Sequence, residues 1–124
     1  MERPVQSNRD LKVWQKAMDL AVEIYRLAAR FPRSETYRLV AQITRAAASV
    51  PSNIAEGHAR ATRRHLANSV AIAKGSLMEA ETFLMLALRL AYLTENEASV
   101  ALGLITENSK MLTALRNRLK EPRE

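Results

Sequence analysis

An apolar stripe that repeats every three to four residues runs without interruption through the third quarter of the chain. This spacing places the apolar residues on one face of an α-helix, as in coiled coils and helix bundles. The stripe therefore predicts a helix over about residues 63–90, with Thr62 as its N-cap. Gly75 lies inside this segment, where glycine is unfavourable, and suggests a close approach of another helix. The members of the stripe are Leu66, Val70, Ala73, Leu77, Ala80, Leu84, Ala87 and Ala91.

Two further segments carry stripes of the same kind. One spans about residues 11–30, with Asp10 as its N-cap, and ends before Pro32 because a residue preceding proline resists the α conformation. The other opens with a capping box, Thr94 to Glu97, and continues to about residue 120. Asn108 lies within its apolar register, where a lone asparagine can determine register or partner choice. The first stripe is Trp14, Ala17/Met18, Ala21, Ile24/Tyr25 and Ala28; the second is Ala98, Ala101, Ile105, Asn108, Leu112, Leu115 and Leu119.

The remaining segment contains a proline, Pro51, in an otherwise helical pattern. Its stripe is Val40, Ile43, Ala47, Val50 and Ile54, and the helical phase does not change at the proline. We therefore predict one helix over about residues 34–57, kinked at Pro51 and ended by Gly57. The alternative is a break, with Ser49 capping a second short helix. In the first interpretation, polar neighbours of Pro51 bind the carbonyl of Ala47 that the proline leaves without a donor.

Four long helices with short connections predict an all-α fold, an antiparallel up-down-up-down four-helix bundle. The chain has 124 residues, enough for one domain over 1–124, with an ordered core of about 9–120 and short polar tails. It has no cysteine, which excludes disulfides and thiolate metal sites. No apolar run is long enough to span a membrane, and the N-terminus has no signal-like apolar core, so we expect a cytoplasmic protein without a membrane partner.

Several apolar residues lie off the main stripes. A single bundle core uses one stripe for each helix, so the extra residues indicate either a wide core or a surface that meets another copy. Self-association is the favoured interpretation. The residues are Leu20, Leu27, Ile72, Phe83, Leu86, Leu90, Val100, Leu104 and Met111.

The net charge of +6 is concentrated in one third of the chain. Residues 26–65 hold eight arginines and two acids, whereas the charges of the other residues cancel. Arg60, Arg63 and Arg64 surround the expected start of a helix, where cations oppose the helix dipole and are not required for folding. Such a group can bind phosphate. The alternatives are a solvated loop that pairs with acids, or a site for an anionic membrane or an acidic protein. No aromatic residue lies among the three arginines, so recognition would be of backbone or shape.

No constellation of catalytic or metal-binding residues is evident. His58 and His65 lack a third ligand nearby, and the polar residues around Pro51 lack a base that would activate a serine. Glu79 and Glu81 are two residues apart and face different directions on a helix. We therefore predict a protein that is not an enzyme and binds no cofactor or metal.

Three stretches resemble one known family. DLKVWQKAMDLAVEIYRL, AASVPSNIAEG and IAKGSLMEAETFL, in this order, are similar to proteins encoded in intervening sequences of bacterial 23S ribosomal RNA genes, over roughly residues 9–117. The resemblance implies a left-handed bundle that assembles as a homopentamer with a central channel. That family is also similar to the accessory variability proteins of diversity-generating retroelements, basic pentamers that bind a reverse transcriptase and its nucleic acid. It implies no catalytic residues. Arg60 matches a basic position after the AEG turn, and His58 stands where an aromatic residue is expected.

Together these observations predict a non-enzymatic, homo-oligomeric protein that binds structured RNA or DNA through an arginine-rich surface. Arg60, Arg63 and Arg64 are the predicted phosphate contacts. Arg38 and Arg45 either help them or form salt bridges between subunits. The alternative function is a protein-interaction scaffold or accessory subunit, for example of a reverse transcriptase, with no nucleic-acid binding of its own.

Overall fold

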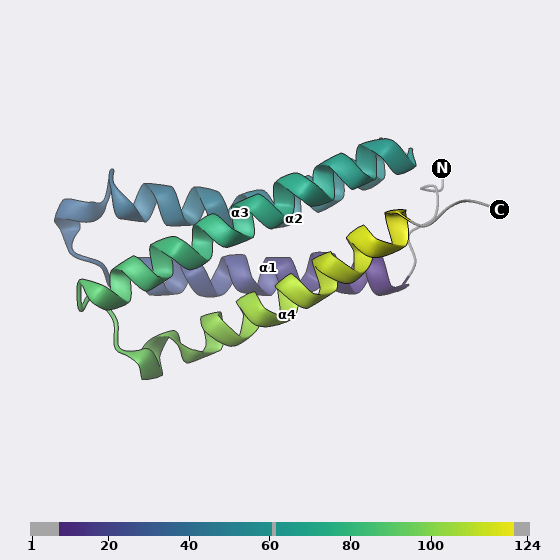
Figure 1. Cartoon of the computed structure of the whole chain (residues 1–124). Helices are drawn as coiled ribbons and strands as arrows, with labels where there is room; N and C mark the ends of the chain where they lie inside the picture. Colours follow the sequence, from purple (N-terminus) through teal and green to yellow (C-terminus); the bar gives the residue numbers. More distant parts are fainter. Residues whose placement is uncertain (1–7, 61, 121–124) are drawn as a thin grey trace.

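The computed structural model describes residues 8–60 and 62–120, which form four α-helices joined by short connections (Figure 1). The helices are α1 (Asn8–Ala28), α2 (Leu39–Ala59), α3 (Arg63–Arg89) and α4 (Glu95–Lys120), and a 3-10 turn, η1 (Arg33–Glu35), lies between α1 and α2. Within these residues there is no β-strand. Asp10 lies inside α1, so the prediction that it caps this helix was wrong.

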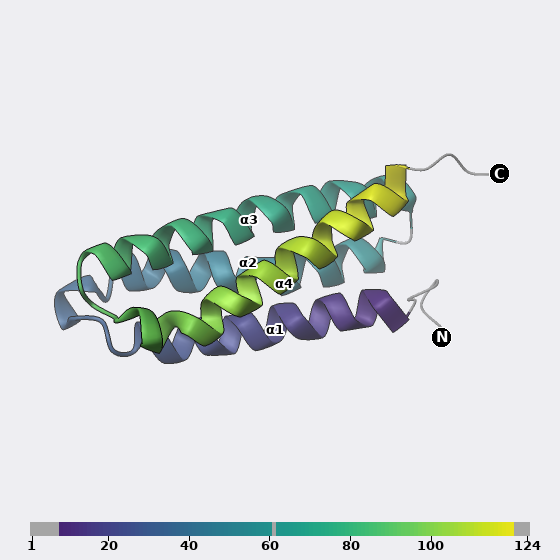
Figure 2. The ribbon, with the colours of Figure 1, turned by 60° about the horizontal axis from the view of Figure 1, so that its bottom comes forward.

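Each helix packs against its two neighbours around the bundle, α1 against α2 and α4, and α3 against α2 and α4. Successive helices run antiparallel, and their order around the axis is left-turning (Figures 1 and 2). The prediction of an all-α up-down-up-down four-helix bundle is confirmed. No helix of the described chain is both long and apolar enough to cross a membrane.

The apolar stripes of α2, α3 and α4 form the core, as predicted, except that Ala91 is exposed just beyond the end of α3. The stripe of α1 was partly wrong. Leu20 and Leu27, which we had placed off the stripe, are buried, whereas Met18 and Tyr25 are exposed. The reason is that α1 also carries apolar residues beside its buried face, at Met18, Val22 and Tyr25. Its sequence pattern therefore leaves the direction of the buried face undecided.

The second helix continues through Pro51, so the interpretation of a single helix is confirmed and the alternative of a break was wrong. Its predicted ends need correction. It begins at Leu39, whose amide donates to Oε1 of Glu35 at 3.2 Å, because residues 33–35 form the 3-10 turn instead of a first α-helical turn. It ends at Ala59, beyond Gly57.

The polar residues that follow Pro51 bind backbone carbonyls, but not the one we predicted. Ser52 Oγ donates to the carbonyl of Ala48 at 2.8 Å, and Asn53 Nδ2 donates to the carbonyl of Ser49 at 2.8 Å. A side chain reaches the carbonyl four residues before it most easily, so these bonds fall one and two residues beyond Ala47.

The two glycines have the opposite roles to those expected. A Cβ atom at Gly57 would lie 2.7 Å from Cβ of Ser69 on α3, so this glycine allows α2 and α3 to approach closely. A Cβ atom at Gly75 would meet nothing within 4 Å, so no helix approaches it in the described chain. Gly57 is thus a packing residue inside a helix instead of a helix stop.

The capping predictions at the other two helix starts are confirmed. Thr62 Oγ1 accepts from the amide of His65 at 3.1 Å. At the start of α4, Thr94 Oγ1 accepts from the amide of Glu97 at 3.1 Å, and Glu97 Oε1 accepts from the amide of Thr94 at 2.9 Å. These bonds satisfy amides that a helix start otherwise leaves without partners.

Asn108 is fully buried, as its place in the stripe predicts. Its Nδ2 donates to the carbonyl of Leu104 at 2.8 Å and to the carbonyl of Lys16 at 3.2 Å. The second bond joins α4 to α1. It therefore sets the register of these two helices within one chain.

Candidate nucleic-acid interface

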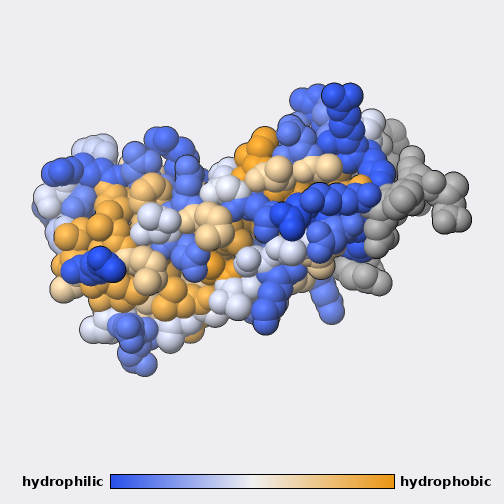
Figure 3. Space-filling view, viewed as in Figure 1, coloured by the Kyte–Doolittle hydropathy of each residue, from blue (hydrophilic) through white to orange (hydrophobic). Residues whose placement is uncertain are grey.

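Cations from three helix ends meet at one end of the bundle (Figure 1). The end of α2, the start of α3 and the end of α4 bring together a group that we call the basic end: Arg60, Arg63, Arg64, Arg118 and Lys120. Residues 57–78 and 108–120 contain no Asp or Glu, so the nearest acid along α2 is Glu56. Figure 3 shows hydrophilic side chains over this end of the α3–α4 face and apolar ones over the other end.

Arg60 is partly neutralised by an acid on its own helix. Its Nε donates to Glu56 Oε2 at 2.7 Å, and Glu56 Oε1 accepts from Ser69 Oγ at 3.0 Å. The hydrogen bond from Arg60, followed by that from Ser69, lowers the pKa of Glu56 below its ordinary range. Arg60 therefore fits, in part, the alternative interpretation in which the arginines of this loop pair with acids.

Arg63 has a structural bond that the sequence argument did not anticipate. Its Nη2 donates to the carbonyl of Arg118, in the last turn of α4, at 2.7 Å. A cation is favourable at a helix C-terminus, and because α3 and α4 are antiparallel, the C-terminus of α4 lies beside the start of α3. Arg63 is unfavourable at the start of α3, but its bond to the end of α4 is favourable. This arginine therefore contributes to the stability of the fold.

Arg64 is the most available of the three predicted arginines. It is exposed, and within the described chain no hydrogen bond or ion pair engages its guanidinium. It lies with His65, Ala67 and Asn68 beside a surface hollow of about 690 Å³. The ring of His65 lies with Nδ1 2.6 Å from Thr62 Oγ1, so this histidine belongs to the helix cap.

Arg38 and Arg45 do not join this group within one chain. Arg38 lies at the start of α2, roughly 30 Å from Arg60 at 1.5 Å per helical residue, and Arg45 is roughly 20 Å from Arg60. Both are exposed. Within the described residues no ion pair links Arg45 to Glu79 or Glu81. The end of the bundle that holds Arg38 also contains acids. Tyr92 Oη donates to Glu35 Oε2 and Arg30 Nη1 donates to Glu97 Oε2, each at 2.6 Å.

Sequence reasoning missed the cations of α4, since acids elsewhere in the chain cancel them when charge is summed over all residues outside 26–65. Arg116, Arg118 and Lys120 lie in the half of α4 that packs beside the start of α3, and Lys74 faces them from α3. Lys74 Nζ donates to Thr113 Oγ1 at 2.8 Å. Desolvation, together with the charge of Arg116, lowers the pKa of Lys74. A run of 13 residues without an acid, 108–120, was the available signal.

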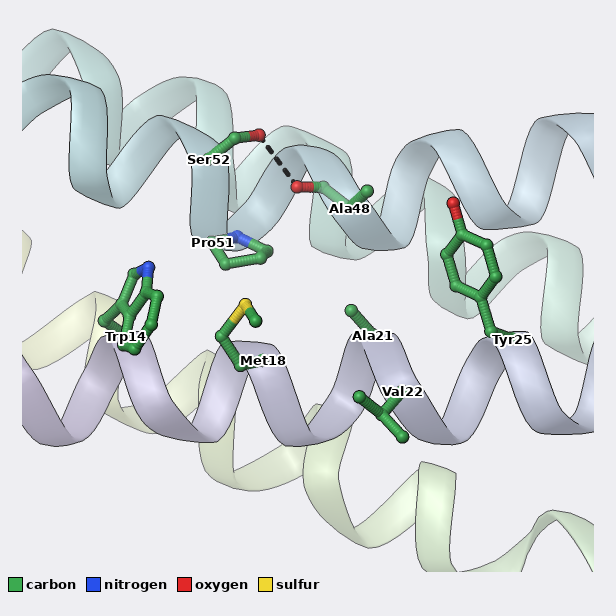
Figure 4. A pocket seen from close by; sticks show the side chains of 8 residues that line it. All are labelled: Trp14, Met18, Ala21, Val22, Tyr25, Ala48, Pro51 and Ser52. Atoms are coloured by element: carbon green, nitrogen blue, oxygen red, sulfur yellow. Dashed lines mark hydrogen bonds between the residues drawn. The ribbon is translucent and has the colours of Figure 1, made fainter.

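An apolar groove of about 510 Å³ lies on the far side of the bundle from α3 and α4, between α1 and α2 (Figure 4). Trp14, Met18 and Tyr25 extend from α1 toward α2, and Met18 lies opposite Pro51. The side chains of Val22 and Tyr25 are 55% and 54% exposed. A second set of exposed apolar residues lies on α3 and α4: Ile72, Met78, Met85, Leu86, Leu90 and Val100. Two separate apolar surfaces therefore remain uncovered in one chain.

The polar residues considered for catalysis have structural partners. Ser49 accepts from Ser76 Oγ at 2.8 Å and from Asn53 Nδ2 at 2.9 Å, which links α2 to α3. His58 is buried at the end of α2. In the described part of the chain, no three His, Cys, Asp or Glu side chains are placed to hold a metal ion.

Comparisons with known proteins agree with this fold. A crystal structure of a protein of unknown function from the S23 ribosomal protein family, from Bacteroides thetaiotaomicron, is similar with a TM-score of 0.81 and 26% identity. The match covers 88% of this chain and 98% of the other. No protein with a curated description matches the chain. The family model of the 23S rRNA-intervening sequence proteins matches residues 9–114. The chain therefore belongs to the 23S rRNA-intervening sequence protein family.

Proposed function

We propose that this protein is a non-enzymatic, homo-oligomeric, basic protein of the cytoplasm that binds structured RNA or DNA through the basic end. The observation that carries the proposal is the convergence of five cations from three helix ends, on segments 57–78 and 108–120 that contain no Asp or Glu. Lysine and arginine contacts to phosphate supply the sequence-independent part of nucleic-acid affinity. A bundle surface without exposed aromatic side chains among the cations fits recognition of the backbone and its shape.

The contribution of each arginine follows from its surroundings. Arg64 is exposed and has no acid partner among residues 8–60 and 62–120, so it is the principal phosphate contact. Arg60 retains free donors beyond its Nε bond to Glu56 and acts as a second contact. Arg63 holds the end of α4 in place and adds positive charge beside the other two arginines. Arg38 and Arg45 contribute only if another copy brings them near.

The two apolar surfaces support self-association as part of this proposal. The groove between α1 and α2 and the apolar residues of α3 and α4 lie on different sides of the bundle and differ in composition. Contact between two different surfaces of identical chains is heterologous, and it produces a ring when the rotation closes. The homopentamer implied by the family resemblance is such a ring. A ring repeats the basic end in every copy, and affinity for phosphate rises steeply with the number of contacts.

A titration tests the nucleic-acid proposal. Binding of a structured RNA and of a duplex DNA is measured at several salt concentrations between about 50 and 200 mM. The wild type should bind with a steep salt dependence. Arg64→Glu/Lys120→Glu should bind weakly, because both side chains are exposed and charge reversal places acids in the basic end. The matched control is Arg33→Glu/Arg89→Glu, the same change on exposed residues at the opposite end.

Equal binding by Arg64→Glu/Lys120→Glu and the wild type would refute the proposed surface. Absence of binding by the wild type at the lowest salt concentration would refute nucleic-acid binding. It would favour the second candidate function, an accessory subunit that engages a protein such as a reverse transcriptase. The exposed apolar groove of α1 and α2 is the observation that supports this candidate.

Sedimentation tests the oligomer. Val22 is 55% exposed in the groove, so Val22→Glu should not disturb the fold of one chain but should oppose a contact there. We expect a lower mass for this variant than for the wild type at equal concentration. A monomeric wild type, or an assembly that Val22→Glu leaves intact, would contradict the use of the groove.

A further inference from the structure

The contact between the first half of α3 and the second half of α4, which we call the cationic seam, has an unbalanced charge. Neither residues 63–78 nor residues 108–120 include an Asp or Glu, yet they include Lys74 and Arg116. Both residues are partly buried, and charges withdrawn from water are normally paired with an opposite charge. Figure 3 shows the hydrophilic part of this face, which extends from the basic end along both helices.

Lys74 and Thr113 form a donor pair across the seam. Lys74 Nζ donates to Thr113 Oγ1 at 2.8 Å, and both residues are partly buried. Because the hydroxyl oxygen accepts this bond, its own proton remains available to donate elsewhere. The ammonium group also has two further protons. The ammonium of Lys74 and the hydroxyl of Thr113, held together by this bond, can therefore both donate to one ligand in the seam.

Arg116 adds a second cation to this region. It follows Thr113 by three residues on α4 and therefore lies on the same face of that helix. Desolvation, and after it the charge of Arg116, lowers the pKa of Lys74. The Nε of Arg116 is buried, and no hydrogen-bond partner engages it in the part of the chain that the structure describes. Two like charges without an acid, one of them with an unsatisfied buried donor, are unfavourable unless an anion joins them.

We infer that Lys74, Thr113 and Arg116 form a phosphate seat that takes one phosphodiester of a nucleic-acid backbone. The inference rests on the proposed function and extends it by a defined contact outside the basic end. The seat lies 11 residues from Arg63 along α3, or about 17 Å at 1.5 Å per residue. A backbone bound at the basic end would therefore continue along the cationic seam. Among the anions with this charge and size, a phosphate accepts from a guanidinium fork, an ammonium and a hydroxyl at once.

The test uses Lys74→Gln/Arg116→Gln in the full chain, with Arg33→Gln/Arg89→Gln as the charge-matched control on exposed residues away from the seam. Each variant must first sediment as the wild type does. Duplex DNA is then titrated at several salt concentrations. The seat variant should bind at least about tenfold more weakly, which is the effect of losing hydrogen bonds to a charged group. Its logarithmic salt dependence should be shallower by about one, because one phosphate contact is lost.

A second readout separates this inference from the proposed function. Inorganic pyrophosphate is added to the wild type and to the seat variant, and the amide resonances of Thr113 and of residue 116 are followed by NMR. Saturable shifts in the wild type alone support the seat. If pyrophosphate binds there but neither the wild type nor the control binds nucleic acid, the proposed function is wrong and the seat is one for free phosphates. If the wild type binds DNA, equal DNA affinity and salt dependence in the seat variant and the control would overturn the seat. The absence of a pyrophosphate response would overturn it in either case.

Discussion

Along α2, the helix α3 meets small and hydrogen-bonded side chains, whereas along the second half of α4 it meets a segment that has cations and no Asp or Glu. On the α2 side, Gly57 brings the backbones together, Ser76 donates to Ser49 at 2.8 Å, and Ser69 donates to Glu56 at 3.0 Å. On the α4 side, Lys74 and Arg116 lie together without an acid. One helix thus makes polar contacts to both neighbours, but only the contact with α4 carries an excess of positive charge. The contact with α2 stabilises the fold, and the contact with α4 has the character of a binding surface.

The largest effect on stability is expected from a change at the close approach of α2 and α3. Gly57→Ala places a methyl group 2.7 Å from Ser69 Cβ, which forces the two helices apart. We expect a loss of about 1–3 kcal/mol in the free energy of unfolding, the usual cost of overpacking. Urea denaturation of the oligomer at fixed protein concentration measures it.

Gly75→Ala is the matched control, because it makes the same change in α3 where nothing lies within 4 Å. Alanine is the better helix former, so this variant should be more stable by about 1 kcal/mol. If both variants gain stability, the approach of α2 and α3 at Gly57 is not limiting. If both lose it, an interface with another copy covers Gly75.

A smaller effect is expected for the hydrogen bond between the two serines. Ser76→Ala removes the donor to Ser49, and it should cost about 1 kcal/mol, the net contribution of one such bond. A double-mutant cycle with Ser49→Ala isolates the coupling between the two hydroxyl groups. A coupling near zero would show that water or Asn53 replaces the lost partner. Ser52→Ala, whose hydroxyl binds only the backbone of its own helix, is the control.

The smallest effects concern the pH dependence of the free energy of unfolding. On the α2 side of α3 a charged group stabilises the fold, whereas on the α4 side a charged group destabilises it. The bonds from Arg60 and Ser69 lower the pKa of Glu56 in the folded state from its ordinary value of 4.5. Their stabilisation is present above that value and is lost as the pH falls through the lowered pKa. Glu56→Gln should therefore flatten the loss of stability in acid. A pH profile identical to that of the wild type would remove Glu56 from the contact.

Lys74 behaves in the opposite sense. Desolvation and Arg116 lower its pKa from 10.5, so its charge destabilises the folded state below the lowered pKa and ceases to do so as the pH rises through 10.5. At neutral pH, Lys74→Met should be as stable as the wild type or more stable by up to about 0.5 kcal/mol, because solvent screens most of the effect. The difference should shrink toward pH 10.5. A clear loss of stability would mean that Lys74 serves the fold.

Most of the bundle followed from the apolar periodicity. The stripes of α2, α3 and α4 needed no knowledge of their neighbours, since a helix with one apolar face must bury that face. Capping at Thr62 and Thr94 was equally local. The continuity of α2 through Pro51 followed from the unchanged phase on either side of it. In α1, where apolar residues occupy almost every inward and lateral position, the local pattern did not identify the buried face.

The helices, the caps at Thr62 and Thr94 and the positive charge near Arg60 could be predicted from the sequence, because these depend on residues within a few turns of one another. Only the tertiary structure decided which cations act together. It separated Arg38 from Arg60 by the length of α2, and it brought Lys74 beside Thr113, which is 39 residues away in the chain. It also gave Arg63 a partner at the end of α4. The physical reason is that charge acts through distance in space, and antiparallel packing makes distant ends of the chain neighbours.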